Sequence, residues 1–247
     1  MSVGTYTPDY FAAFADTSLS SAQRLMPIVL DVVSARTAVD IGCGSGAWTR
    51  AMLDLGIDAT GIDGDYVDRS KLLIPAERFV ARDLSSGSFE LDGTFDLAIS
   101  VEVAEHLPEP SAAAFVERLT TLAPVVLFSA AIPHQGGNHH INEQWQSYWR
   151  ALFAARGYAA YDVVRPAIWD EPSVDSWYAQ NALVYSREPL DAPAPVVTDV
   201  VHPRLYEQHH TPSDLTMRDM LKAARDAASR MQATRRISER YRRLTSR

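Results

Sequence analysis

Short runs of consecutive apolar residues alternate along this chain with longer segments in which apolar residues recur every three or four positions. The runs predict buried β-strands, because a strand covered on both faces is apolar along its whole length. The longer segments predict amphipathic helices. The expected strands are residues 37–41, 59–62, 78–81, 95–101, 125–130, 159–164 and 182–186, and the expected helices are residues 20–33, 47–55, 111–122 and 143–156.

This alternation predicts an α/β fold, a doubly wound, mostly parallel sheet of the Rossmann-like type with helices on both faces. The chain has 247 residues, which is enough for one large domain. The first helix is expected to begin at Ser20 or Ser21, since serine is a frequent N-cap. We expect an N-terminal lid segment (1–19), a main domain (20–187), a Pro-rich linker (188–210) and a basic C-terminal helix (211–247).

The composition narrows the class of protein. Hydrophobic residues make up 47% and charged residues 22% of the chain, as in ordinary globular proteins. No apolar run approaches the roughly 20 residues of a membrane helix, and the first residues lack the pattern of a secretory signal. The one cysteine, Cys43, excludes an internal disulfide. We therefore expect a cytoplasmic protein with no membrane partner.

The charge is unevenly distributed. The formal net charge is −8, yet residues 217–247 carry 10 basic and 3 acidic side chains, leaving 13 basic and 28 acidic ones elsewhere. An acidic body argues against a nucleic-acid partner. The basic tail is either a solvated helix face or a surface that packs against the body or a second subunit, so a homodimer through this helix is a further expectation.

The most specific motif, VDIGCGSGAW at residues 39–48, begins within the first expected strand and continues directly into glycines. Its alternate glycines, Gly42, Gly44 and Gly46, allow a tight turn in which backbone N–H groups and a helix N-terminus face a ligand. Asp63 ends the second expected strand, where a carboxylate can accept both hydroxyls of a ribose. The loop also satisfies the dinucleotide pattern G-x-G-x-x-A, so the loop alone leaves NAD open.

Three further features accompany this loop: Asp40 before the first glycine, Asp83-Leu84 after the third strand, and Glu105-His106-Leu107 after the fourth. Together they resemble the class I S-adenosylmethionine (SAM)-dependent methyltransferases over residues 37–187. The resemblance implies a seven-stranded sheet with an antiparallel edge strand, SAM as cofactor and S-adenosylhomocysteine (SAH) as product. The implied cofactor-binding residues are Asp40, Gly42, Cys43, Gly44, Gly46, Asp63, Gly64, Asp83, Leu84 and Val101.

In this family the glycine loop holds the amino-acid end of SAM. The acid after the second strand, here Asp63, holds the ribose, and the acid after the third, here Asp83, holds the adenine amino group. The acceptor is then expected beyond the fourth and fifth strands, at the carboxyl ends of the sheet. The E-x-x-E-H sequence at residues 102–106 is similar to one found there in many small-molecule methyltransferases. His106 either faces the acceptor or, with Glu105, only holds the loop.

Residues 132–145 follow the fifth strand and contain three histidines, two glycines and a tryptophan. They resemble a bacterial methyltransferase subgroup with a G-G-x-x-H-[IV]-N-E-Q-W sequence at this place. His140 is our first choice as general base or acceptor-positioning group, because imidazole exchanges a proton near neutral pH. His139, His134 and a mechanism without a base stay open. Asn142 is expected to cap the following helix.

We expect no metal. The histidine spacing matches neither a helix-face pair nor a zinc knuckle, and no cysteine accompanies it, although carboxylates suited to Mg²⁺ are available at Asp83, Glu102, Glu105 and Glu143.

The sequence thus predicts a methyltransferase that moves a methyl group from SAM to a small-molecule or sugar acceptor, most readily a hydroxyl. The expected mechanism is in-line displacement with deprotonation of the acceptor by a histidine. N-methylation of a small-molecule amine uses the same geometry and stays open. A protein that binds SAM without catalysis and an NAD-dependent oxidoreductase are the alternatives from other classes.

Overall fold

The computed structural model describes residues 8–195 and 197–209. The chain divides into two compact units, Met1–His202 and Pro203–Arg247. The described part of the second unit is the short helix α7 (Pro203–His209), within the predicted linker. The predicted tail helix, and with it the expected dimer contact, lies outside the described residues. The sheet and every site residue predicted from the sequence lie in the first unit.

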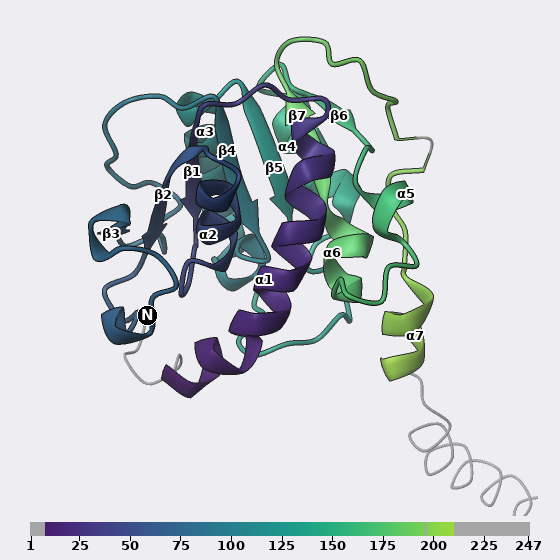
Figure 1. Cartoon of the computed structure of the whole chain (residues 1–247). Helices are drawn as coiled ribbons and strands as arrows, with labels where there is room; N and C mark the ends of the chain where they lie inside the picture. The colour runs from purple at the N-terminus through teal and green to yellow at the C-terminus, as the bar shows by residue number, and fades with distance from the viewer. Residues whose placement is uncertain (1–7, 196, 210–247) are drawn as a thin grey trace, which may run out of the picture. The chain divides into compact units, whose positions relative to one another are not determined.

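Each predicted strand forms, with boundaries that differ by a few residues at most. The strands are β1 (Thr37–Ile41), β2 (Asp58–Asp63), β3 (Phe79–Ala81), β4 (Leu97–Val101), β5 (Val125–Ser129), β6 (Ala159–Tyr161) and β7 (Leu183–Ser186). They form one sheet in the order β3-β2-β1-β4-β5-β7-β6 (Figure 1). The pairs among β1 to β5 are parallel, and β7 is antiparallel to both β5 and β6. The predicted Rossmann-like, mostly parallel seven-stranded sheet is confirmed. The antiparallel strand is β7, which lies between β5 and β6 and not at the predicted edge of the sheet.

Helices cover both faces of the sheet. They are α1 (Pro8–Leu30), α2 (Ala47–Asp54), α3 (Ala112–Leu122), α4 (Gln146–Ala154), α5 (Arg165–Ile168) and α6 (Ser176–Asn181). The first apolar core contains residues of α1, α2, α5 and α6, and the second contains residues of α3 and α4. On β5, Leu127 packs into the first core, whereas Val126 and Phe128 pack into the second. Successive strand residues face opposite sides, so β5 is apolar throughout.

Two predicted helix starts are wrong. Helix α1 begins at Pro8, and Ser20 and Ser21 lie inside it. Their hydroxyls bond to the segment before α6 instead: Ser20 Oγ donates to the Ser173 carbonyl at 3.0 Å, and Ser21 Oγ accepts the Asp175 N–H at 3.0 Å. A serine inside a helix can thus serve a tertiary contact rather than a cap.

Helix α4 begins at Gln146 with Trp145 as its N-cap, so Asn142 does not cap it. Asn142 is buried, and its N–H donates to the Glu105 carbonyl at 3.0 Å. Within the described residues, every helix is too short or too polar to span a bilayer.

Candidate active site

The glycine loop connects β1 to α2, and packing within the protein explains two of its glycines. Gly42 has φ +85, and a Cβ built there would lie 2.4 Å from a methyl carbon of Val103. A Cβ at Gly46 would lie 2.9 Å from the Ile74 side chain. A side chain at Gly42 would therefore be strained by its backbone and by its neighbour alike. The side chain of Val103, in the turn after β4, thus packs directly against Gly42 of the loop.

Asp63, the last residue of β2, is bonded directly to this loop. Its Oδ2 accepts the Gly44 N–H at 2.7 Å, and its Oδ1 accepts the Gly64 N–H at 2.6 Å and the Tyr66 hydroxyl at 2.5 Å. The side chain is buried, and burial raises the pKa of Asp63 above its ordinary value. The structure therefore brings Asp63 beside the glycine loop, as predicted, and adds Tyr66 as a partner that sequence reasoning missed.

Asp40 and Cys43 both make contacts within the protein, Asp40 with α2 and Cys43 with β2. Asp40 is buried and its Oδ2 accepts two bonds from Thr49 in the first turn of α2, from Oγ1 at 2.7 Å and from N–H at 3.1 Å. It thereby joins β1 to α2. The Cys43 sulfur packs over Gly61, where a Cβ would lie 2.7 Å from it. Burial raises the pKa of the Cys43 thiol well above its ordinary value, so the thiol is a poor nucleophile.

Asp40 should make the stability of the ligand-free protein depend on pH. Burial raises its pKa from 3.8 to about 7, so between about pH 4 and pH 7 the folded chain holds a proton that the unfolded chain releases. Its contribution to the free energy of unfolding therefore falls as pH rises through this window, by up to about 4 kcal/mol.

Asp40→Asn keeps an acceptor for Thr49 and removes the titration. We expect the free energy of unfolding of the variant, relative to wild type, to increase between pH 5 and pH 8 in urea titrations. A constant difference across this range would contradict the buried, protonated state of Asp40.

The remaining predicted cofactor residues lie at the ends of β3 and β4. Asp83 is exposed just after β3, and its Oδ1 accepts the Ser85 N–H at 2.9 Å, a bond that lowers the pKa of Asp83. Leu84 and Val101 are buried. Because β3, β2, β1 and β4 are neighbours in this order, their carboxyl ends place all the predicted cofactor residues along one edge of the sheet.

The two acids along this edge fit the hydrogen-bond donors of an adenine nucleoside: Asp63 offers a buried carboxylate, and Asp83 offers an exposed carboxylate further along the edge. A ribose diol and an exocyclic amine both donate hydrogen bonds, and carboxylates accept them. Most N–H groups of the glycine loop, which the sequence predicted to face a ligand, bond within the protein instead. Those of Gly42 and Cys43 donate to the Ile62 carbonyl, that of Gly46 to the Cys43 carbonyl and that of Gly44 to Asp63.

The same edge continues past β4 into a network of carboxylates and amides. Glu102 follows β4 with φ 55, an uncommon conformation for a residue with a side chain. Its N–H donates to the Ser129 carbonyl at 3.0 Å. Its Oε2 accepts from Gln135 Nε2 at 2.9 Å, and its Oε1 accepts from Asn181 Nδ2 at 3.1 Å. Glu102 thus joins the ends of β4, β5 and α6.

Buried amides extend this network, and the sequence analysis did not identify them. Gln180 Nε2 donates to Gln135 Oε1 and to Asn181 Oδ1, both at 3.0 Å, and Asn181 Nδ2 donates to Gln135 Oε1 at 2.9 Å. Gln180 and Asn181 end α6, immediately before β7. The predicted antiparallel strand could have pointed to them. Because β7 is antiparallel to β5 and β6, its start, and the residues just before it, lie at the carboxyl ends of these neighbours.

The histidine-rich loop folds around Glu143. Its Oε1 lies 3.0 Å from His140 Nδ1 and also accepts the Gly136 N–H at 2.8 Å, while its Oε2 accepts the His134 N–H at 2.8 Å. His134 and His139 are exposed, and His140 is half-buried. The Glu143 carboxylate therefore orients His140. Because Glu143 bonds to the loop in this way, it does not begin the helix, and α4 starts three residues later than predicted.

His106 and His140 come together at the centre of the site. Their ring centroids are 4.9 Å apart and the rings are nearly perpendicular. His106 Nδ1 lies 3.3 Å from the His139 carbonyl oxygen. Burial, together with the neighbouring His140, lowers the pKa of His106 to about 4, so this imidazole is neutral near pH 7. His139, another of the predicted histidines, meets this pair through its carbonyl oxygen.

Glu105 lies beside the two histidines and is fully buried. Its backbone carbonyl accepts the N–H groups of Ile141 and Asn142 at 2.9 and 3.0 Å, which fixes the histidine loop to the turn after β4. Among the described residues, neither of its carboxylate oxygens has a hydrogen-bond partner. Burial and the nearby Glu102 carboxylate raise the pKa of Glu105 well above its ordinary value.

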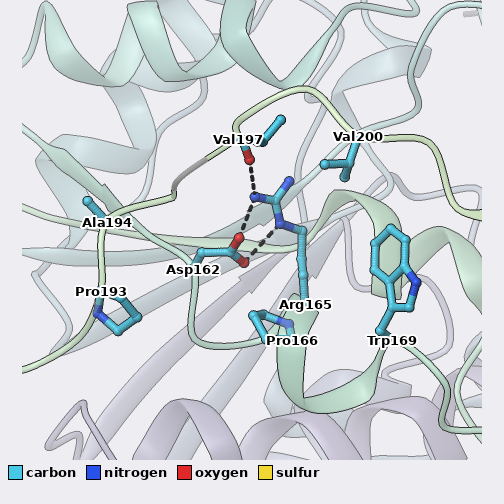
Figure 2. A pocket seen from close by; sticks show the side chains of 8 residues that line it. All are labelled: Asp162, Arg165, Pro166, Trp169, Pro193, Ala194, Val197 and Val200. Carbon is cyan, nitrogen blue, oxygen red and sulfur yellow. Dashed lines mark hydrogen bonds and ion pairs between the residues drawn. The ribbon is translucent and has the colours of Figure 1, made fainter.

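A separate cavity of about 320 Å³ lies beside α5 (Figure 2). Arg165 in its wall is buried, and its guanidinium bonds to both oxygens of Asp162 and to the carbonyls of Val197 and Thr198. Figure 2 shows the guanidinium between Asp162 and Val197. These bonds attach the segment after β7 to the domain, so the role of Arg165 is structural.

Comparisons with known proteins identify the family of the chain. A family model described as a methyltransferase domain matches residues 20–162. The ubiquinone biosynthesis O-methyltransferase of Methylococcus capsulatus is 30% identical over 130 residues, 46% of this chain and 54% of that protein. The enzyme of the same name from Xanthomonas campestris pv. campestris is 34% identical over 122 residues, 42% and 51% of the two chains. The chain spans about half the length of these curated relatives.

Solved structures show the same fold at low identity. An O-methyltransferase family protein from Burkholderia thailandensis is 12% identical with a TM-score of 0.53, over 73% of this chain and 58% of that chain. A magnesium protoporphyrin IX methyltransferase from Synechocystis, solved with bound SAH, is 16% identical with a TM-score of 0.50, over 71% and 84%.

Proposed function

The chain belongs to the methyltransferase-domain family of SAM-dependent enzymes, and from this premise we propose that it methylates a hydroxyl group of a small molecule. The observation that carries the proposal is the half-buried His106–His140 pair, which follows the carboxyl ends of β4 and β5 on the sheet that also bears the glycine loop and Asp63. The acidic body, with 13 basic and 28 acidic residues outside residues 217–247, disfavours a polyanionic acceptor.

The loop and the acids along the sheet edge would hold SAM. The glycine loop at residues 42–46 would lie against its amino-acid end. Asp63 would face its ribose hydroxyls, and Asp83 would face its adenine amino group. When bound, SAM supplies a methyl group on a positively charged sulfur. The chain's own part is to place the acceptor oxygen in line with that methyl group and to keep water away.

The two histidines would serve the acceptor. The Glu143 bond to His140 Nδ1 fixes the ring and favours the tautomer in which Nε2 carries the lone pair. An acceptor hydroxyl next to this pair would lose its proton as the oxygen–methyl bond forms. His140 is our first choice for this step, with His106 as its neighbour. The curated relatives are named O-methyltransferases, which supports a hydroxyl as the acceptor.

Gly137 tests whether the position of His140 matters. Gly137 has φ +154, and a Cβ there would lie 2.2 Å from His140 Nε2. Gly137→Ala should push the ring aside, and we expect kcat to fall about 10- to 100-fold while the Kd for SAH stays the same. Gly93→Ala is the control, because Gly93 has φ +89 and open space around its Cα. If both variants lowered kcat equally, the fall would be due to backbone strain and not to displacement of the His140 ring.

The function itself is tested by release of SAH from SAM in the presence of panels of phenols, sugars and amines, after calorimetric titration with SAH. We expect binding of SAH and turnover with a hydroxyl acceptor. Turnover with amines alone would make the protein an N-methyltransferase. Binding of NADH without binding of SAH would overturn the cofactor assignment.

A further inference from the structure

Three side chains at the centre of the acceptor site form a set of metal ligands. Glu105, His106 and His140 each offer one ligand atom, and these atoms all lie within 4.8 Å of one another. A divalent cation sits about 2.1 Å from such ligands, so modest side-chain rotations would bring all three into its coordination sphere. One carboxylate oxygen and two imidazole nitrogens are donors suited to a divalent first-row transition metal.

Glu105 gives independent evidence for a cation. It is fully buried, and neither carboxylate oxygen has a hydrogen-bond partner among the described residues. A buried polar group without a partner is costly and calls for an explanation such as an ion. A second carboxylate, Glu102, acts electrostatically on Glu105, which increases the need for positive charge.

The surroundings of the two histidines match those of metal ligands. His140 Nδ1 is bonded to the Glu143 carboxylate, and His106 Nδ1 lies within hydrogen-bond distance of the His139 carbonyl oxygen. A histidine that donates from Nδ1 to an oxygen carries its lone pair on Nε2, and such bonds orient the imidazole ligands of metals. The hydrogen bonds from the N–H groups of Ile141 and Asn142 to the Glu105 carbonyl keep the loop that carries His140 next to Glu105 and His106.

We propose that Glu105, His106 and His140 bind one divalent metal ion, which would polarise the acceptor hydroxyl. The inference rests on the proposed function and refines it. Three protein ligands leave coordination positions for an acceptor oxygen, and coordination lowers the pKa of a bound hydroxyl. That hydroxyl then releases its proton to solvent before the methyl group arrives, so His140 acts as a ligand rather than as the base. The expectation of no metal, drawn from sequence spacing, would then be wrong.

The test is direct titration of the chelator-treated full chain with Mn²⁺, followed by electron paramagnetic resonance and calorimetry. We expect saturation at one Mn²⁺ per chain and nitrogen couplings from two imidazoles. Glu105→Gln should weaken binding by more than about tenfold without lowering the melting temperature of the metal-free protein, because it removes an unpartnered carboxylate. Glu109→Gln is the matched control, because Glu109 is an exposed glutamate four residues further along, in the next short helix.

Three outcomes would overturn the metal site: no saturable binding up to about 1 mM Mn²⁺, unchanged affinity in Glu105→Gln, or bound Mn²⁺ without nitrogen couplings. A parallel titration with SAH separates this result from the proposed function. Binding of SAH without Mn²⁺ removes only the metal site, whereas binding of Mn²⁺ without SAH removes the proposed function on which the role of the metal depends.

Discussion

Asp63→Ala is expected to weaken SAH binding about 10- to 150-fold. A hydrogen bond to a charged group contributes about 1.5–3 kcal/mol, and Asp63 would supply such bonds to the ribose. The variant also removes the acceptor that holds the Gly44 and Gly64 N–H groups at 2.7 and 2.6 Å. The loop would therefore lose its anchor at the same time as the ligand loses its partner. Calorimetric titration at constant ionic strength measures the change.

Asp65→Ala is the matched control for this experiment. Asp65 lies in the same turn, but its side chain is 85% exposed and pairs with Arg69. Its loss should change the Kd for SAH by less than about twofold, because exposed ion pairs contribute little. A folded Asp63→Ala protein that binds SAH as tightly as wild type would show that the acid after β2 has no part in the cofactor site.

His140→Ala is expected to lower kcat by about 10²- to 10⁴-fold, the range for loss of a group that assists proton removal. The expectation holds whether His140 accepts the proton or binds the metal, because both roles need the imidazole that Glu143 orients. The Kd for SAH should stay within about threefold of wild type, since His140 lies in the acceptor half of the site. Single-turnover and steady-state rates with one acceptor measure the effect.

Asn138→Ala controls for disturbance of the loop. Asn138 is exposed two residues before His140, so we expect its loss to leave kcat nearly unchanged. If His140→Ala retained more than about a third of the wild-type kcat, the acceptor would be methylated by proximity alone.

The fold, and the placement of the residues proposed for the cofactor, were open to prediction because their signals are local. The apolar run at residues 37–41 is β1 itself, and the glycines follow it directly. Asp63 ends a strand that pairs with β1, so adjacency in the sheet alone brings it to Gly44. Prediction succeeds here because strand order and the carboxyl-end rule fix positions without knowledge of loops.

The acceptor half could not be predicted in the same way, because it depends on contacts between distant loops. Glu105 and His140 meet only because the Glu105 carbonyl binds the N–H groups of Ile141 and Asn142. The spacing of residues 132–145 does not indicate that this loop folds back onto Glu105. Asn142 looked like a helix cap because the sequence cannot show that Glu143 is already bonded to the N–H groups of the loop.

Because β7 is antiparallel to its neighbours, the two halves of the site come from different parts of the sequence. The residues predicted for the cofactor precede position 102, whereas Gln180 and Asn181 reach the acceptor network from the end of α6, just before β7. Substitutions or insertions in the segment between β6 and β7 can therefore reshape the acceptor side while the residues along β1 to β3 stay constant. The part of the acceptor side that α6 supplies can thus vary within one continuous stretch of sequence, without disturbing the residues proposed for the cofactor.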